Sequence, residues 1–175
     1  MAVKIRPIVL KDAASYRRCW DEVAKERRYI TERRAPPLSD VRAQVRESLR
    51  KKTPFLVAVD AKRVVGWTAA YRFGQPSLSH NGRLGMSLLP AYREMGLGTK
   101  LMARLLKMSR GKFHVLYLEV FWKNKRARRL YEKMGFEPSG RIKNYVKGLA
   151  YGSDDALFMH KNLLHGRPRP ERTWR

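Results

Sequence analysis

Residues 84–101 constrain the fold more than any other part of the chain. They read Leu-Gly-Met-Ser-Leu-Leu-Pro-Ala-Tyr-Arg-Glu-Met-Gly-Leu-Gly-Thr-Lys-Leu, a β-type run followed by a glycine-containing turn and an amphipathic helix. Glycines at a strand-to-helix turn let backbone N–H groups approach an anion, and the unpaired amides and dipole of the helix start favour negative charge. The stretch therefore predicts a strand, an anion-binding turn and a helix. Further donors are available from Arg93, Thr99 and Lys100.

Taken alone, the glycine pair is a weak signal, because ordinary turns before helices also contain glycines. Neither a Walker loop nor the three-glycine dinucleotide fingerprint is present in the sequence. The turn therefore disfavours ATP and NAD as ligands. Its meaning depends on what the rest of the chain predicts.

The remaining sequence alternates between β-type and helical periodicity. Strands are predicted at residues 3–9, 55–59, 64–71, 83–89, 115–121, 136–145 and 155–160. Helices are predicted after Asp12, which can cap the first one, from near Ser39, from Leu97 and around Ala127 to Met134. Pro7 favours an edge position for the first strand. The order β-α-α-β-β-β-α-β-α-β-β predicts one α/β domain. We assign residues 1–163 to it and residues 164–175 to a basic, proline-containing tail that is mobile unless a partner holds it.

The charge of the chain is extreme. Its 175 residues include 39 lysines and arginines against 15 acidic residues, a formal net charge of +24. Such a charge attracts nucleic acid, the ribosome or anionic cofactors and repels cationic ligands. The basic residues are spread along the chain without a recognised RNA-binding or zinc-finger spacing, so a solvated basic surface is an equal alternative.

Cysteine content and hydropathy exclude several classes of protein. The single cysteine, Cys19, excludes an intramolecular disulfide and a cysteine-rich zinc site, and no metal is expected. The first residues lack the apolar core of a signal peptide, and no apolar run approaches membrane-spanning length. We therefore expect a cytoplasmic protein with no membrane partner.

A second motif lies after the fifth predicted strand. Together the two motifs resemble those of the GCN5-related N-acetyltransferase (GNAT) superfamily. The superfamily's cofactor motif, Arg/Gln-x-x-Gly-x-Gly/Ala, is met by Arg93, Gly96 and Gly98. Its later motif, Asn-x-x-Ala-x-x-Leu-Tyr-x-x-x-Gly-Phe, is met at every fixed position by Asn124, Ala127, Leu130, Tyr131, Gly135 and Phe136. The resemblance covers about residues 3–163 and looks closest to the bacterial branch of ribosomal-protein alanine and small-amine acetyltransferases.

The resemblance implies a mixed, mostly antiparallel sheet of about seven strands flanked by about four helices. It also implies acetyl-CoA as cosubstrate and assigns residues to it: Leu88, Arg93, Glu94, Met95, Gly96, Leu97, Gly98, Thr99, Asn124, Ala127 and Tyr131. The family's splayed fourth strand donates a backbone N–H to the acetyl oxygen, and we expect that amide to be Leu88. Asn124 has a simpler alternative as a helix N-cap. Glu94 and Met95 depart from the family, where many relatives have glycine and a basic residue.

The resemblance further implies direct transfer of the acetyl group to a primary amine in a ternary complex. Tyr131 is the candidate general acid near the CoA sulfur, with a packing residue of an apolar helix face as the alternative. Glu119, the acid of the fifth predicted strand, is the candidate base, directly or through water, or else a carboxylate paired with a lysine. His80 and His114 are weaker candidates for the base.

Acceptor specificity in this family comes from the first two helices, the loop before the fourth strand and the last hairpin. Those segments hold aromatic and acidic residues, namely Tyr29, Glu32, Trp67, Tyr71, Tyr145, Tyr151, Asp154 and Asp155. The positive charge disfavours polyamines and aminoglycosides unless Glu32, Asp154 and Asp155 form a local acidic pocket, and it leaves small amines, amino acids and protein amino groups. The alternative function is a GNAT-like scaffold that mainly binds RNA or the ribosome through its basic surface. A homodimer is left open.

Overall fold

The computed structural model describes residues 3–164, so the predicted tail from residue 165 onward lies outside the described residues. Its helices are α1 (Ala13–Lys25), α2 (Leu38–Arg50), α3 (Leu97–Ser109) and α4 (Lys125–Lys133). Its strands are β1 (Lys4–Pro7), β2 (Phe55–Asp60), β3 (Arg63–Arg72), β4 (Asn81–Leu88), β5 (Val115–Phe121), β6 (Glu137–Leu149) and β7 (Gly152–Asn162). The element order is the one that the sequence predicts.

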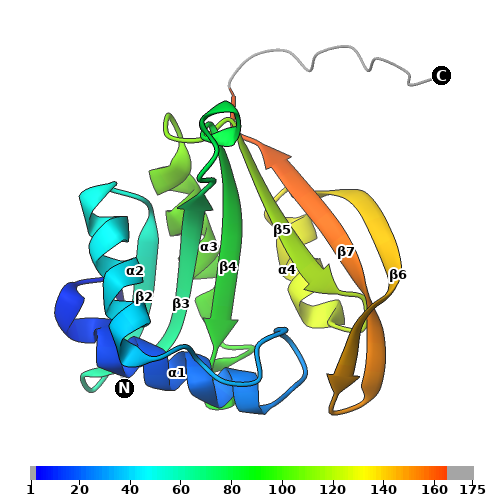
Figure 1. Cartoon of the computed structure of the whole chain (residues 1–175), viewed down its shortest axis with the longest axis horizontal. Helices are drawn as coiled ribbons and strands as arrows, with labels where there is room; N and C mark the ends of the chain where they lie inside the picture. The colour runs from blue at the N-terminus through cyan, green and yellow to red at the C-terminus, as the bar shows by residue number, and fades with distance from the viewer. Residues whose placement is uncertain (1–2, 165–175) are drawn as a thin grey trace.

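The seven strands form one sheet in the order β1-β2-β3-β4-β5-β7-β6. Every neighbouring pair is antiparallel except β4 and β5, which run parallel. Helices α1 and α2 cover one face and α3 and α4 the other (Figure 1). This architecture confirms the predicted mixed, mostly antiparallel α/β sheet, and β1 occupies the edge position that Pro7 favours.

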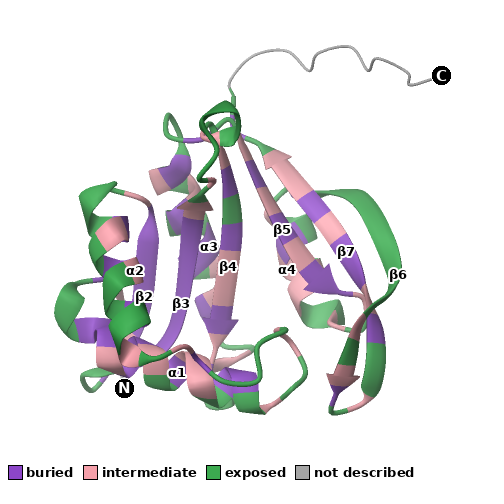
Figure 2. Cartoon of the chain, viewed as in Figure 1, coloured by how far each residue is buried: buried purple, intermediate pink, exposed green. Residues whose placement is uncertain are grey.

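Burial is concentrated in the centre of the sheet. Strands β2 and β3 are buried almost throughout because helices cover both of their faces, whereas β6 is exposed along most of its length (Figure 2). Tyr16 of α1 packs edge-on against Phe55 and Trp67, with ring centroids 5.2 and 5.3 Å away. Such pairs add roughly 0.5–1.5 kcal/mol each to the free energy of burial. The first helix is thus anchored to the middle of the sheet.

Strands β4 and β5 separate along their length. Their parallel pairing covers only residues 81–83 of β4, which pair with residues 115–117 of β5. Beyond Arg83 and Tyr117 the two strands diverge, while β4 stays paired with β3 up to Leu88. The second half of β4 is therefore paired with β3 on one edge and has no strand partner on the edge that faces β5.

Besides small shifts in strand ends, the structure differs from the predicted details at Asp12 and in the last hairpin. The carboxylate of Asp12 does not cap α1; it binds the guanidinium of Arg6 at 2.6 and 2.8 Å and accepts from Val9 N–H at 2.9 Å. The last hairpin is longer than predicted, with β6 reaching Leu149 and β7 beginning at Gly152. Its exposed residues lack the apolar alternation from which strand ends are predicted.

None of the helices in the described residues has both the length and the apolar character needed to span a membrane.

Candidate active site

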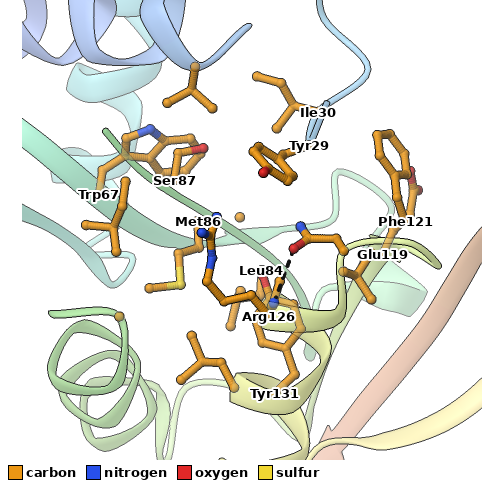
Figure 3. Close-up of a pocket in the computed structure, with 18 of the residues that line it drawn as sticks. Tyr29, Ile30, Trp67, Leu84, Met86, Ser87, Glu119, Phe121, Arg126 and Tyr131 are labelled. Carbon is orange, nitrogen blue, oxygen red and sulfur yellow. Dashed lines mark hydrogen bonds between the residues drawn. The ribbon is translucent and has the colours of Figure 1, made fainter. Parts of the chain in front are cut away.

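A cavity of about 540 Å³ occupies the gap between β4 and β5. Side chains alternate along a strand, so residues 84, 86 and 88 of β4 face α3 and residues 83, 85 and 87 face α1. The cavity is lined by both sets and by Glu119 and Phe121 of β5. It therefore passes through the sheet. Figure 3 shows Tyr131 on one side of it and Tyr29 and Ile30 on the other.

The turn between β4 and α3 contributes backbone groups to the α3 side of the cavity. Gly96 adopts φ +74°, a left-handed conformation that favours glycine, and reverses the chain into the helix. The first i to i−4 hydrogen bond of α3 runs from Lys100 N–H to Gly96 C=O at 3.1 Å, so the amides of residues 97–99 precede it. A Cβ at Gly98 would lie 3.1 Å from Leu130 Cδ2. The turn is shaped so that an anionic group can approach the backbone closely, which fits the pyrophosphate of a coenzyme A thioester.

The two departures from the family motif lie in this turn. Glu94 lines the cavity and has φ +64°, the left-handed region in which a residue with a Cβ is strained. Met95 is 63% exposed and does not line the cavity, and Leu97 is buried. A carboxylate at position 94 also adds negative charge to the turn that is predicted to bind an anion.

Arg93 is engaged within the protein. Its Nε donates to the carbonyl of Leu88 at 2.9 Å, and its two terminal nitrogens pair with the carboxylate of Glu26, one of them at 2.7 Å. The guanidinium also lies 4.9 Å from the ring centre of Tyr29. In this arrangement Arg93 ties the turn to the end of α1, and a contact with phosphate stays a prediction.

Leu88 presents its N–H toward the gap. Leu89 N–H donates to Val65 C=O of β3 at 2.9 Å, so the alternating pattern of an antiparallel ladder directs the N–H and C=O of Leu88 away from β3. The hydrogen bond from Arg93 to the Leu88 carbonyl agrees with that direction. The amide predicted to hold the acetyl oxygen thus lies on the edge of β4 that faces β5.

The second motif places one cap and one phenol beside the same cavity. The side chain of Asn124 accepts a hydrogen bond from Ala127 N–H at 3.2 Å and is the N-cap of α4. Tyr131 lies two turns further, with 7% of its surface exposed, and lines the cavity with Asn124, Ala127 and Leu130. Burial raises the pKa of Tyr131 to about 12. The phenol therefore keeps its proton at neutral pH, as a general acid requires.

Glu119 faces the cavity from the α1 side of the sheet. Its carboxylate accepts a hydrogen bond from Tyr145 Oη at 3.2 Å and lies 3.8 Å from the nearest nitrogen of Arg83. The side chain is 14% exposed. The carboxylate is thus paired with an arginine instead of the lysine considered for it, and it still lines the cavity where a base would act.

Comparison with known proteins agrees with this geometry. The profile of the acetyltransferase (GNAT) family matches residues 15–136. The chain belongs to the GNAT acetyltransferase family. Membership makes it an N-acetyltransferase, and none of the comparisons points to an RNA-binding scaffold.

Solved structures similar to this GNAT acetyltransferase carry several different names. A ribosomal-protein-alanine N-acetyltransferase from Brucella melitensis is 25% identical, with a TM-score of 0.81 over 91% of this chain and 99% of that one. A phosphinothricin acetyltransferase from Sinorhizobium meliloti, in complex with AcCoA, is 21% identical, with a TM-score of 0.85 over 99% and 95%. A putative acetyltransferase from Salmonella typhimurium with acetyl-CoA is 20% identical, with a TM-score of 0.85 over 98% and 99%. The search of curated protein sequences found no match.

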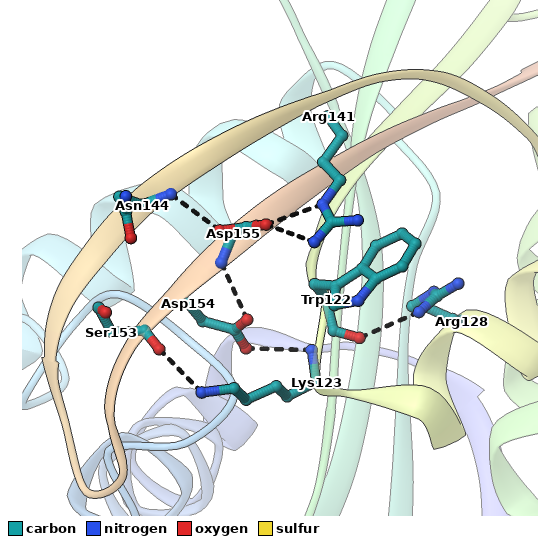
Figure 4. A network of polar contacts seen from close by, with 8 residues as sticks. All are labelled: Trp122, Lys123, Arg128, Arg141, Asn144, Ser153, Asp154 and Asp155. Carbon is teal, nitrogen blue, oxygen red and sulfur yellow. Dashed lines mark hydrogen bonds and ion pairs between the residues drawn. The ribbon is translucent and has the colours of Figure 1, made fainter.

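The acceptor-side residues of the acetyltransferase divide into two groups. Tyr29, Glu32, Trp67 and Tyr71 line the cavity. Asp154 and Asp155 belong instead to a polar network near the turn of the β6–β7 hairpin (Figure 4). Asp154 is buried and accepts from Lys123 N–H, Asp155 N–H and Tyr151 Oη at 3.1, 2.9 and 2.8 Å. These two carboxylates are used within the protein, so they do not provide an acidic pocket.

The hairpin also joins the loop after α1. Arg27 donates to Gly148 C=O at 2.5 and 3.2 Å, and Ala150 N–H donates to Arg27 C=O at 2.8 Å. Because Tyr29 and Ile30 of the same loop line the cavity, these contacts help to form the α1 side of the cavity.

Three site residues escape prediction from the sequence: Glu26, Arg83 and Arg126. Arg83 and Arg126 line the cavity, and Glu26 holds Arg93. Lysine and arginine are so common in this chain that neither arginine stands out. Arg83 could have been found from strand alternation. It lies near the start of β4 and points to the opposite face of the sheet from Leu84 and Met86.

The weaker candidates lie outside the cavity lining of the described chain. The rings of His80 and His114 lie 5.1 Å apart, beside the starts of β4 and β5. Cys19 is buried, and burial raises the pKa of its thiol to about 12, so it is not a nucleophile. Residues 3–164 contain no group of three or more His, Cys, Asp or Glu side chains that could hold a metal ion.

Proposed function

We propose that this acetyltransferase transfers an acetyl group directly from acetyl-CoA to a primary amine in a ternary complex. The observation that carries the proposal is a single cavity that joins the glycine turn and Tyr131 on one face of the sheet with Glu119 on the other. Bound acetyl-CoA supplies the acetyl group as a thioester, activated toward an amine nucleophile. The remaining chemistry is assigned to the residues of the chain.

Backbone amides have two roles in the proposal. Those of residues 97–99 bind the pyrophosphate, because they precede the first hydrogen bond of α3 and stand at the positive end of its dipole. The amide of Leu88 donates to the acetyl oxygen as that oxygen gains charge. A donor of this kind is worth roughly 10²–10³ in kcat. Since both roles use backbone groups, side-chain substitution at Leu88 would test little.

Proton transfer is assigned to Glu119 and Tyr131. Glu119, directly or through water, accepts the proton that the ammonium group must lose before its nitrogen can attack. A C–N bond forms and the C–S bond breaks. As the C–S bond breaks, the nitrogen gives its second proton to solvent, and Tyr131 gives its proton to the departing sulfur and is reprotonated from solvent. The products are the N-acetylated amine, CoA thiol and the released proton.

The route contains no acyl-enzyme. The chain has one cysteine, and its buried thiol has a pKa raised to about 12 by burial. Transfer without a covalent intermediate requires both substrates to be present together, which a cavity open to both faces of the sheet permits. Incubation with acetyl-CoA alone is expected to leave the protein mass unchanged.

The acceptor is a small amine, an amino acid or a protein amino group. The Brucella relative, a ribosomal-protein-alanine N-acetyltransferase by name, supports the last class. Polycationic acceptors are disfavoured by the net charge of +24, and Asp154 and Asp155 are engaged in the hairpin. An association with the ribosome or nucleic acid stays a prediction from the charge alone.

Two measurements test the proposal. Calorimetric titration with acetyl-CoA at low salt is expected to show one site per chain. Release of free CoA should then depend on an added amine across a panel of amino acids, simple amines and peptides with free N-termini. Binding without amine-dependent release from any member of the panel contradicts the proposed transfer, and absence of binding contradicts the cosubstrate.

A further inference from the structure

The α1 side of the cavity carries one isolated ion pair on its strands. Among the described residues of β3, β4 and β5 that line the cavity, only Arg83 and Glu119 are charged. Their nearest atoms, Arg83 Nη2 and Glu119 Oε2, lie 3.8 Å apart, beyond the roughly 2.7–2.9 Å of a charge-assisted hydrogen bond. Both groups therefore keep donors and acceptors that a ligand can use.

The tyrosines next to the pair on β3, β5 and the hairpin add no charge of their own. Tyr71 lies opposite Arg83 on β3 and Tyr117 lies beside it on β5. Burial raises the pKa of Tyr71 to about 12 and that of Tyr117 in the same direction, so both phenols stay neutral. Tyr145 donates to Glu119 from the hairpin. Glu32 is the other carboxylate that lines this end of the cavity, and it comes from the exposed loop after α1.

The pair also has a direction relative to Leu88. Arg83 is level with Tyr117, so Glu119 lies two residues further along β5, toward the end where β4 reaches Leu88. Leu88 lies five residues beyond Arg83, about 17 Å along an extended strand. Glu119 therefore stands between the amide proposed to hold the acetyl oxygen and the guanidinium of Arg83.

We propose that the acceptor is a free α-amino acid whose ammonium group binds Glu119 and whose carboxylate binds Arg83. This inference rests on the proposed acetyl transfer. An α-amino acid places its two charged groups on one carbon, which suits two opposite charges that already lie close together. The amine then points toward Leu88 and the carboxylate away from it.

Other acceptor classes leave part of this arrangement unused. A simple amine or a peptide N-terminus has no carboxylate to place at Arg83. A polyamine would bring a second cation toward the guanidinium. The apolar wall made by Trp20, Ile30 and Trp67 favours an apolar side chain on the amino acid.

The test compares leucine with leucinamide and 3-methylbutylamine in the acetyl-CoA assay. These acceptors share a side chain and differ in the group that should meet Arg83. Since the loss of a charge-assisted hydrogen bond is worth about a tenfold to hundredfold change, kcat/KM for leucine should exceed that for either analogue by this factor. At neutral pH a larger fraction of leucinamide than of leucine carries a free amine, so amine protonation cannot produce a preference for leucine over leucinamide.

Variants assign the preference to Arg83. Arg83→Ala should lower kcat/KM for leucine by the same factor and leave leucinamide nearly unchanged, whereas Arg83→Lys should restore part of the preference. Arg42→Ala, on the exposed face of α2, is the matched control and should behave as the wild type. Calorimetric titration of the CoA complex with leucine should show the same ranking of variants without turnover.

Separate outcomes overturn the inference and the proposed function. If amines are acetylated but leucinamide or a peptide such as Ala-Leu-amide matches or exceeds leucine, the acceptor is not a free amino acid. A preference for leucine that Arg83→Ala does not change removes the assignment to Arg83. If no amine in the panel releases CoA, the acetyl transfer itself fails, and the inference fails with it.

Discussion

The two sides of the cavity are built in different ways. The α3 side comes from residues 84, 86 and 88 of β4 and from two short segments, residues 93–99 and 124–131, and in the proposed function it acts largely through backbone groups and one phenol. The α1 side collects side chains from the loop after α1, from β3, β4 and β5, and through Tyr145 from the distant hairpin. Groups close in sequence are positioned by local geometry, whereas the acceptor side depends on contacts between distant segments.

This difference separates what substitutions should do. Changes on the α3 side should alter acetyl-CoA binding or the chemical step with little effect on acceptor choice. Changes on the α1 side should alter the acceptor and leave acetyl-CoA binding intact. The following predictions test that separation, from the largest expected effect to the smallest.

Removal of the candidate acid should have the largest effect. Tyr131→Phe is expected to lower kcat about 100-fold, the lower end for general acid catalysis, because the departing sulfur loses its proton donor. The dissociation constant of acetyl-CoA should stay within about twofold in the same titration. Tyr16→Phe removes another buried phenol, outside the cavity lining, and should keep wild-type kcat. A Tyr131→Phe enzyme with full kcat would exclude Tyr131 as the acid.

Loss of the buried hairpin carboxylate should affect only the acceptor side. Asp154→Ala leaves three donors without their acceptor, so the free energy of unfolding should fall by about 2–3 kcal/mol. The KM of the amine should rise while the dissociation constant of acetyl-CoA does not change. Denaturant unfolding and steady-state kinetics measure the two effects, with Asp40→Ala on the exposed face of α2 as control. If acetyl-CoA binding weakened as much as amine binding, the two sides of the cavity would be coupled.

Replacing Glu94, which departs from the family motif, should increase both the stability of the protein and its affinity for acetyl-CoA. Glu94→Gly relieves the left-handed conformation at φ +64° and should raise the free energy of unfolding by about 1 kcal/mol. It should also tighten acetyl-CoA binding, because a carboxylate leaves the anion site. Glu94→Gln removes the charge but keeps the strained backbone conformation. This variant should therefore bind acetyl-CoA more tightly without becoming more stable. If neither variant binds more tightly, the carboxylate does not face the phosphates.

Low pH should reduce the local stability of the β6–β7 hairpin. Hydrogen bonds from Asn144 N–H and Arg141 hold the pKa of Asp155 below its ordinary value of 3.8. A lowered pKa in the folded state contributes stability that is complete above 3.8 and lost as the pH falls through the lower folded value. The hydrogen-exchange protection of Asn144 N–H, corrected for intrinsic rates, should therefore fall toward pH 3. Asp155→Asn should abolish this dependence; a persisting pH effect would point to another carboxylate.

Prediction from the sequence succeeds where the determinants are local. The element order follows from apolar periodicity and the edge position of β1 from Pro7, and both are confirmed. The predicted ends of β6 and β7 are wrong because this exposed hairpin is held by polar contacts and has no apolar alternation that marks where its strands end. The cap assigned to Asp12 is wrong because Arg6, six residues away, takes the carboxylate instead.

The candidate site divides along the same line. The resemblance to the family could pick out Gly96, Gly98, Asn124 and Tyr131 because its two motifs lie within one turn and one helix, and all four residues line the cavity. Arg83, Glu26 and the partner of Glu119 could not, since each depends on which strands and loops come to lie side by side. A hydrogen bond to Tyr145, 26 residues further along the chain, leaves no trace in the local pattern of β5.

The sequence by itself determined the glycine turn before α3, the tyrosine of the second motif and the α/β element order, because these arise from backbone conformation and periodicity within short segments. Only the tertiary structure decided that β4 and β5 diverge after Arg83 and Tyr117 and that the resulting gap connects the two faces of the sheet. It also decided which charges meet there. Packing of distant segments selects such pairs, and no local pattern records that choice.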